Sequence, residues 1–236
     1  MARFVKHGPC PSCGSRDNLA EYDDGSSYCF GCHYYKGRQH IPNSFMQEEE
    51  EQLVQVPTTV TKDFPASALK FFGSVPLTTI LRYPVFYDPV REQVLFVFYN
   101  KAGHPACIQA RNLNPERAKR SKYYNVGDKQ EVLPIYGQDE CTTLVLTEDA
   151  LSAMKVSEVV HAMPLLGTSI TASKLAQLAK KYQTIIVWLD RDKWREAREI
   201  ADKAKWMGLS AHSVFTPDDP KTYTTEKING YLANAR

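Results

Sequence analysis

The sequence predicts an α/β protein: a compact parallel sheet with helices on its faces, preceded by an α+β subdomain and by a small β module with four cysteines. Two runs of β-branched and apolar residues, 142–147 and 184–189, are typical of strands buried on both faces of a sheet. A helical pattern follows each run. Strands and helices alternate from residue 142 to residue 208, which fits a parallel sheet.

The composition limits the class of protein. The 236 residues allow one large or two small domains. The formal net charge of +2 means that nucleic-acid binding would depend on local patches of cations. No apolar run approaches the length of a membrane span, and the N-terminus lacks the apolar segment of a signal peptide. We therefore expect a cytoplasmic protein with no membrane partner.

Four of the six cysteines form two pairs near the N-terminus, with the spacing C-x2-C-x15-C-x2-C: Cys10, Cys13, Cys29 and Cys32. This spacing is typical of a zinc ribbon, in which two tight turns supply four thiolates to one Zn²⁺. A disulfide framework or a redox pair is the alternative, and a cytoplasmic location favours metal. We expect the module to need its metal for folding. The flanking His7 and His33 are expected at the surface or behind the ligands, and Cys107 and Cys141 in the core.

Basic and aromatic residues alternate in the cysteine-containing module. The cations are Arg3, Lys6, Arg16, Lys36 and Arg38. The aromatic residues are Tyr22, Tyr28, Phe30, Tyr34 and Tyr35. This mixture suits single-stranded nucleic acid, because cations meet phosphates and rings stack on bases. A protein-docking surface is the alternative, and Tyr28 and Phe30 are expected to form the small core of the module.

Residues 39–60 lack sustained periodicity and include an acidic run at positions 48–51. They are interpreted as a flexible linker. From residue 61 the pattern indicates a globular segment. A short helix is predicted at residues 66–72, ending at Gly73. Antiparallel strands are predicted at residues 85–87, 94–99 and 107–111, with a turn at residues 100–103.

A basic segment, interpreted as a loop, covers residues 112–124. With the residue before it, it contributes five cations: Arg111, Arg117, Lys119, Arg120 and Lys122. Such a run is by default a solvated loop. Because it directly precedes the strands that end in acids, we favour a binding site for triphosphates or for a template backbone.

Acidic residues follow both buried strands of the predicted parallel sheet. Asp190 and Asp192 follow residues 184–189, and Glu148 and Asp149 follow residues 142–147. Ligands of open α/β sheets bind beyond the carboxyl ends of the strands, and residues two apart on an extended strand share a face. The sequence therefore predicts a carboxylate cluster that holds Mg²⁺ or Mn²⁺ for phosphoryl transfer. Acids that only cap the following helices are the alternative.

The C-terminal region supplies further candidates. Residues 167–169 precede a helix predicted at residues 171–180, and could either offer N–H groups to a phosphate or form an ordinary helix cap. A last strand is predicted at residues 214–216. Asp219 could join the metal site and Lys221 could contact a phosphate, but both also suit an ordinary turn. The sequence contains no G-x-x-x-x-G-K-[ST] motif of a P-loop motor domain.

These residues resemble, in the same order, the primase part of phage primase–helicases and, more distantly, bacterial primases. Residues 7–15 through 28–32 are similar to the template-reading zinc ribbon of that family. Residues 142–219 are similar to its Toprim fold, with Glu148 as the first metal acid and Asp190 and Asp192 as the Asp-x-Asp pair. Residues 103–137 are similar to the N-terminal half of its polymerase domain, where a lysine and an arginine hold nucleotides.

The resemblance implies three segments: a zinc ribbon at residues 1–38, the linker at residues 39–60 and a primase domain at residues 61–236. The primase domain would divide into an N-terminal subdomain, residues 61–140, and a Toprim subdomain, residues 141–236. Two departures from the family pattern stand out. Glu148, Asp149 and Ala150 are contiguous, whereas the family has a glycine and several residues between the acids. Residues 193–195 replace the glycine that normally follows Asp-x-Asp.

The function implied is that of a DNA-dependent RNA primase, which makes short RNA primers on single-stranded DNA in phage-type DNA replication. The reaction implied is phosphoryl transfer assisted by two Mg²⁺ ions. Glu148, Asp190 and Asp192 would bind the metal, with Asp149 or Asp219 assisting. Arg111, Lys119 and Lys122 would neutralise triphosphate or template. The partners implied are single-stranded DNA, ribonucleoside triphosphates, a separate helicase and a DNA polymerase. A non-catalytic single-stranded DNA-binding protein and a Toprim nuclease are the alternatives.

Overall fold

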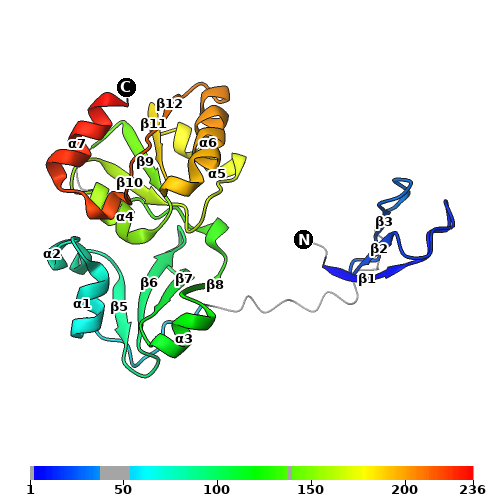
Figure 1. The fold of residues 1–236 in the computed structure, drawn as a ribbon, viewed down its shortest axis with the longest axis horizontal. Helices are drawn as coiled ribbons and strands as arrows, with labels where there is room; N and C mark the ends of the chain where they lie inside the picture. Colours follow the sequence, from blue (N-terminus) through cyan, green and yellow to red (C-terminus); the bar gives the residue numbers. More distant parts are fainter. Residues whose placement is uncertain (1–2, 38–53, 138–139, 236) are drawn as a thin grey trace. The chain divides into compact units, whose positions relative to one another are not determined.

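The computed structural model describes residues 3–37, 54–137 and 140–235. The chain forms two compact units, residues 1–51 and 52–236, and each is considered by itself (Figure 1). Arg38, the acidic run and most of the predicted linker lie outside the described residues. Within the described residues, no helix has the length and apolar character needed to cross a membrane.

The first unit contains a small antiparallel sheet whose strands follow one another in chain order. The strands are β1 (Phe4–Gly8), β2 (Leu19–Tyr22), β3 (Ser27–Cys29) and β4 (Tyr35–Lys36). Its buried apolar residues are few, and they include Cys10, Leu19 and Cys29. A core of this size supplies little hydrophobic stabilisation, which is why small modules of this kind depend on metal.

The second unit begins with an α+β subdomain. Its helices are α1 (Ala66–Phe72), α2 (Leu77–Leu81) and α3 (Pro115–Arg120). Its antiparallel sheet has the order β5 (Val85–Asp88), β6 (Gln93–Tyr99), β7 (Pro105–Asn112) and β8 (Tyr123–Gly127). The predicted helix, its end at Gly73 and the first three strands are confirmed. A glycine at a helix end and runs of β-branched and aromatic residues are both strong local signals.

The basic segment at residues 112–124 is not a loop, and the prediction is wrong on this point. Asn114 caps α3 by accepting hydrogen bonds from the backbone N–H groups of Glu116 and Arg117, with Pro115 in the first turn. Tyr123 then begins a fourth strand, β8. Asn followed by Pro is a helix-start signal, which the dense charge of the segment obscured.

The α/β core contains a four-stranded parallel sheet. Its strand order is β10 (His161–Pro164), β9 (Thr143–Thr147), β11 (Thr184–Trp188) and β12 (Ser210–Ser213). The helices are α4 (Ala150–Val156), α5 (Ala172–Ala179), α6 (Trp194–Trp206) and α7 (Thr225–Asn234). Short 3-10 turns lie at Lys129–Glu131 (η2), Arg191–Lys193 (η3) and Pro220–Thr222 (η4). The predicted α/β class is confirmed.

Alternate residues of the two central strands enter two different cores. Leu144, Leu146, Ile185 and Val187 pack with α5 and α6 on one face. Val145, Ile186 and Trp188 pack with α4 and α7 on the other. The two pairs of helices lie on opposite sides of the sheet (Figure 1). Both faces of β9 and β11 are therefore dry, as their continuous apolar runs predict.

Two features near the C-terminus differ from the sequence predictions. The last strand is β12, Ser210–Ser213, and not residues 214–216, because the more polar segment pairs in register with β11 while Phe215 is exposed. Helices α2 and α7 were not predicted. Each presents only two buried residues, so the periodic apolar signal is weak.

One hydrophobic core joins the two parts of the second unit. Phe72 of α1, Ile80 of α2 and Phe96 of β6 belong to the same cluster of buried residues as Val145 and Trp188 of the parallel sheet. The packed unit also begins before the predicted boundary at residue 61. Val54, Val56 and Val60 pack against the other face of the antiparallel sheet, so this end of the predicted linker is part of the unit.

We predict that the end of β8 packs against Ala106 and Val54 only if residue 127 is a glycine. Its φ is +84°, and a Cβ there would lie 2.2 Å from the Ala106 carbonyl oxygen and 2.4 Å from Val54 Cγ2. Gly127→Ala should lower the free energy of unfolding by about 2–5 kcal/mol, from left-handed strain plus overpacking. Gly103→Ala is the control, because its φ is +82° with nothing near the new Cβ; it should cost only about 1–2 kcal/mol. Equal costs in urea denaturation would contradict the packing argument.

Candidate functional site

A cavity of about 290 Å³ lies at the carboxyl edge of the parallel sheet. Glu148 and Asp149 reach it from the end of β9, and Asp190 reaches it from the end of β11. The antiparallel sheet forms the facing wall with side chains of β7 and β8. The residues that line the cavity are Gln109, Tyr123, Asn125, Glu148, Asp149, Leu166, Gly167, Asp190 and Lys221. The acids from two separate strands thus share one cavity, as the sequence predicts.

Glu148 and Asp190 each hold a carboxylate oxygen that is buried and has no hydrogen-bond partner among the described residues: Glu148 Oε2 and Asp190 Oδ1. Burial, together with the nearby carboxylates of Asp219 and Glu148, raises the pKa of Asp190 to about 7. Burial and then Asp149 likewise raise the pKa of Glu148. Both groups are therefore short of positive charge, which a bound cation would supply.

Asp149 faces the same cavity but is fully engaged. It caps α4: its Oδ1 accepts from the Ser152 backbone N–H at 3.0 Å, and its Oδ2 accepts from Ser152 Oγ at 2.9 Å. Lys221 also donates to Asp149 Oδ2 at 2.8 Å, and the same ammonium lies 2.8 Å from Asp219 Oδ2. The helix-cap alternative thus holds for Asp149. Two of the three donors of the Lys221 ammonium thus face carboxylates.

Asp192 does not line the cavity. Strand β11 ends at Trp188, and Asp192 lies in the 3-10 turn η3, so the period-two argument that paired it with Asp190 does not apply. Its side chain is 72% exposed and accepts a hydrogen bond from Lys193. In the part of the chain that the structure describes, only the four cysteines bring three or more potential ligand atoms within 4.8 Å of one another.

The cavity nevertheless fits Mg²⁺. This ion is usually held by one or two carboxylates and keeps waters or substrate phosphates as its other ligands. Glu148 and Asp190 supply two anionic oxygens with no other partner, and they are hard donors of the kind that Mg²⁺ or Mn²⁺ prefers. Glu148 and Asp190 would therefore hold the metal directly, with room in the cavity for further oxygen ligands.

Arg111 is the predicted cation that the structure orients best. Its guanidinium carbon lies 5.2 Å from the centre of the Phe71 ring and 4.8 Å from that of the Tyr123 ring. Such stacking stabilises a cation while leaving most of its donors free, and Arg111 Nε has no partner among the described atoms. Tyr123 itself lines the cavity.

The two predicted lysines stand farther from the carboxylates. Lys119 lies on α3 and pairs with Glu116 at 2.7 Å, and neither is in the lining of the cavity. Lys122 is exposed in the connection between α3 and β8, directly before Tyr123. Neither lysine lines the cavity, and both are exposed.

Sequence reasoning missed the two amides of the facing wall. Gln109 and Asn125 are directly opposite each other on β7 and β8, and Gln109 Nε2 donates to Asn125 Oδ1 at 3.3 Å. Gln109 Oε1 is buried without a partner among the described residues. A buried glutamine inside an otherwise apolar strand was the available signal, but its partner strand had not been predicted.

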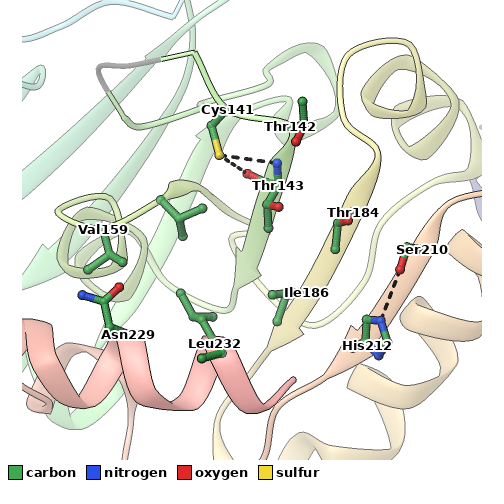
Figure 2. A pocket seen from close by; sticks show the side chains of 12 residues that line it. Cys141, Thr142, Thr143, Val159, Thr184, Ile186, Ser210, His212, Asn229 and Leu232 are labelled. Atoms are coloured by element: carbon green, nitrogen blue, oxygen red, sulfur yellow. Dashed lines mark hydrogen bonds between the residues drawn. The ribbon is translucent and has the colours of Figure 1, made fainter. Parts of the chain in front are cut away.

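A larger cavity, about 810 Å³, lies at the opposite edge of the parallel sheet, where Thr143, Thr184 and Ser210 begin their strands (Figure 2). The Cys141 thiol donates to the Thr143 carbonyl at 3.2 Å, and Ser210 and His212 share a hydrogen bond of 3.2 Å. None of the described residues that line it is acidic, lysine or arginine. It therefore lacks the charged groups that phosphoryl transfer needs.

The four cysteines of the first unit converge as predicted. Their Sγ atoms lie within 4.8 Å of one another, with 3.6 Å between Cys10 and Cys32 and 3.7 Å between Cys13 and Cys29. A disulfide needs about 2.05 Å between sulfurs. Four thiolates at 2.3 Å from a tetrahedral Zn²⁺ stand about 3.8 Å apart, so the spacing fits zinc and excludes disulfides.

Both cysteine turns use the same backbone device. In the first turn the backbone N–H of Gly14 donates to the carbonyl of Cys10 at 2.9 Å. In the second turn the backbone N–H of His33 donates to the carbonyl of Cys29, also at 2.9 Å. Both residues have positive φ, +68° at Gly14 and +60° at His33. His33 also contacts the Tyr28 hydroxyl at 2.6 Å and is not a ligand.

Aromatic side chains of the first unit form an exposed group. Phe30 is 60% exposed, which contradicts the prediction that it forms the core, whereas Tyr28 is half-buried beside it. The ring centroids are 5.3 Å apart for Phe30 and Tyr28, and 4.8 Å apart for Phe4 and His7. The exposed rings offer stacking surfaces for bases. The exposed cations Arg3, Lys6 and Lys36 directly precede or follow aromatic residues in the chain, and Lys6 also pairs with Glu21 at 3.6 Å.

Comparison with solved structures identifies the fold. The primase fragment of the bacteriophage T7 primase–helicase matches with a TM-score of 0.55 and 17% identity, over 99% of both chains. The zinc-binding and RNA polymerase domains of Aquifex aeolicus primase match with a TM-score of 0.54 and 13% identity, over 99% of this chain and 79% of that one. A DnaG primase catalytic domain bound to single-stranded DNA matches with a TM-score of 0.52 and 24% identity, over 64% of this chain and 55% of that one.

No protein-family model and no curated protein sequence matches this chain. The structural likenesses establish that the chain has the fold of the zinc-binding and catalytic parts of DNA primases. The relation to phage and bacterial primases that the sequence suggested is thereby confirmed at the level of the fold. Each of the three known structures is less than 25% identical in sequence to this chain.

We predict that Asp190→Asn stabilises the protein in Mg²⁺-free buffer. The pKa of Asp190 is about 7, above its ordinary value of 3.8, so ionisation destabilises the folded state. This penalty is absent below pH 4, grows as the pH rises and is complete above pH 7. After allowance for solvent screening, the gain should be about 1 kcal/mol at pH 8 and vanish near pH 4. Asp192→Asn, the exposed control, should give no gain; equal gains in thermal unfolding would contradict this account.

A second prediction concerns the cysteines. Purified protein should contain one zinc ion per chain, and Cys29→Ser should lose it together with the fold of the first unit. The melting of residues 52–236 should not change, because that unit has its own core. Cys141→Ser should keep the zinc. Metal analysis and calorimetry provide the check, and retention of full zinc by Cys29→Ser would refute the four-thiolate site.

Proposed function

We propose that this chain synthesises short RNA primers on single-stranded DNA from ribonucleoside triphosphates, in a Mg²⁺-dependent nucleotidyl transfer. The observation that supports this best is the pair of unpartnered carboxylate oxygens, Glu148 Oε2 and Asp190 Oδ1, inside a cavity of a primase-like fold. A DNA polymerase is a further partner proposed, by analogy with the T7 lagging-strand DNA polymerase that interacts with primase domains. A replicative helicase is also proposed as a separate protein, because the T7 primase fragment belongs to a primase–helicase.

Glu148 and Asp190 would hold the metal at the carboxyl edge of the parallel sheet. Bound there, Mg²⁺ would lower the pKa of the primer 3′-hydroxyl and neutralise charge on the attacked phosphate. Arg111, held between Phe71 and Tyr123, would direct its guanidinium at a triphosphate. The amides of Gln109 and Asn125 would orient the nucleotide. Lys122, which is exposed and directly precedes Tyr123 in the chain, would contact a phosphate.

The first unit would bind the template. Its exposed rings, Phe30 among them, would stack on bases, and the neighbouring cations would contact phosphates. Zinc would fix the two cysteine turns that carry these strands. In this proposal the first unit recognises DNA, and residues 52–236 carry out nucleotidyl transfer.

The decisive experiment is dinucleotide synthesis on a randomised pool of single-stranded templates. Asp190→Asn should lower synthesis about 1,000-fold, or about 4 kcal/mol of transition-state stabilisation, because an unpartnered metal ligand is lost. Asp192→Asn should lower it about tenfold or less, since this carboxylate points to solvent and reaches the site at most through water. Circular dichroism should show both variants folded.

Unchanged synthesis by Asp190→Asn would refute the proposed function. An equal loss in the two variants would instead mean that Asp192 turns into the cavity when metal binds.

A second candidate function is binding of single-stranded DNA without catalysis. The outward position of Asp192 and the pairing of Asp149 and Asp219 with Lys221 favour it, because they leave few acids free. Mg²⁺-dependent incorporation of ribonucleotides separates the two functions. Cleavage of DNA under the same conditions would favour a nuclease.

A further inference from the structure

Lys221 is a cation built into the carboxylate cavity. Its ammonium lies 2.8 Å from Asp149 Oδ2 and 2.8 Å from Asp219 Oδ2. The Lys221 side chain is 28% exposed and that of Asp149 is 18% exposed. Charges that are partly shielded from water interact more strongly than surface pairs, so these contacts are costly to break.

The three acids that line the cavity and the nearby Asp219 therefore fall into two groups. Asp149 receives hydrogen bonds from Ser152 and from Lys221, and Asp219 is paired with the same ammonium. Glu148 and Asp190 each keep a buried oxygen without a partner among the described residues. Asp149 and Asp219 thus already contact a cation, whereas the unpartnered oxygens of Glu148 and Asp190 contact none among the described residues.

The backbone around Lys221 is held in place. Lys221 lies in the 3-10 turn η4, which packs against α4, and Pro220 beside it is buried. The Lys221 carbonyl accepts a hydrogen bond from Ser74 Oγ, and the Asp219 carbonyl accepts from the Thr222 backbone N–H at 2.9 Å and from Thr222 Oγ1 at 2.8 Å. The backbone that carries the Lys221 side chain is therefore held in a fixed turn, so the ammonium stays close to the acids.

We propose that Lys221 takes the place of a second metal ion, so that the cavity binds one divalent cation, on Glu148 and Asp190, instead of two. The inference rests on the proposed function only for the identity of the cation as Mg²⁺ or Mn²⁺. A lysine ammonium carries one positive charge and three donors, and two of these are used by Asp149 and Asp219. The third donor remains for an oxygen of a bound nucleotide.

The test counts Mn²⁺ ions on the full-length, zinc-loaded chain by the electron paramagnetic resonance signal of free Mn²⁺ during titration. The wild type should bind one Mn²⁺, and Asp190→Asn should lose it. Lys221→Met keeps the length of the side chain and removes the charge. It should bind two ions, because Asp149 and Asp219 are then free to hold the second. Lys221→Met/Asp149→Asn should return the count to one.

Lys193→Met is the matched control, since Lys193 also pairs with an aspartate but outside the cavity lining. It should leave the count at one. A wild-type count other than one, or a count of one for folded Lys221→Met, overturns the inference; thermal melting establishes that the variant is folded. Primer synthesis plays no part in this measurement. A wild type that binds one Mn²⁺ but makes no primers would overturn the proposed function alone.

Discussion

The burial of β9 and β11 on both faces is the constraint on which the second unit depends. Their side chains alternate between two apolar cores, so no position along either strand tolerates a charge without a partner. The first charged side chains can appear only where the strands end. In a parallel sheet these ends lie at one edge, which brings Glu148 and Asp190 into the same cavity although 42 positions separate them in the sequence.

Local patterns explain why much of the fold could be predicted. Three local patterns each depend on residues close together in the chain: the β-branched and aromatic run of β6, the apolar runs of β9 and β11, and the spacing of the four N-terminal cysteines. The same logic failed at Asp192. It assumed that the strand continues through the acids, whereas β11 ends at Trp188 and the chain enters a 3-10 turn. A few residues of different backbone geometry are enough to reverse the direction of a side chain.

The remaining parts of the site depend on contacts between distant segments, which the sequence does not encode locally. Lys221 meets Asp149 across 72 positions. Arg111 is stacked between Phe71, from α1, and Tyr123, from a strand hidden in a basic segment. A turn residue such as Lys221 looks the same in sequence whether it faces solvent or acids. Only the packing of η4 against α4 distinguishes the two.

The single core that joins α1, α2 and β6 to the parallel sheet has a consequence for how this protein can be divided. One wall of the carboxylate cavity comes from the antiparallel sheet and the other from the α/β core. A cut near residue 140 would strip Phe72, Ile80 and Phe96 from the apolar surface of α4 and would separate Arg111 from the acids. Domain dissection should therefore keep residues 54–235 together, and chimeras with other proteins of this fold should exchange the first unit alone.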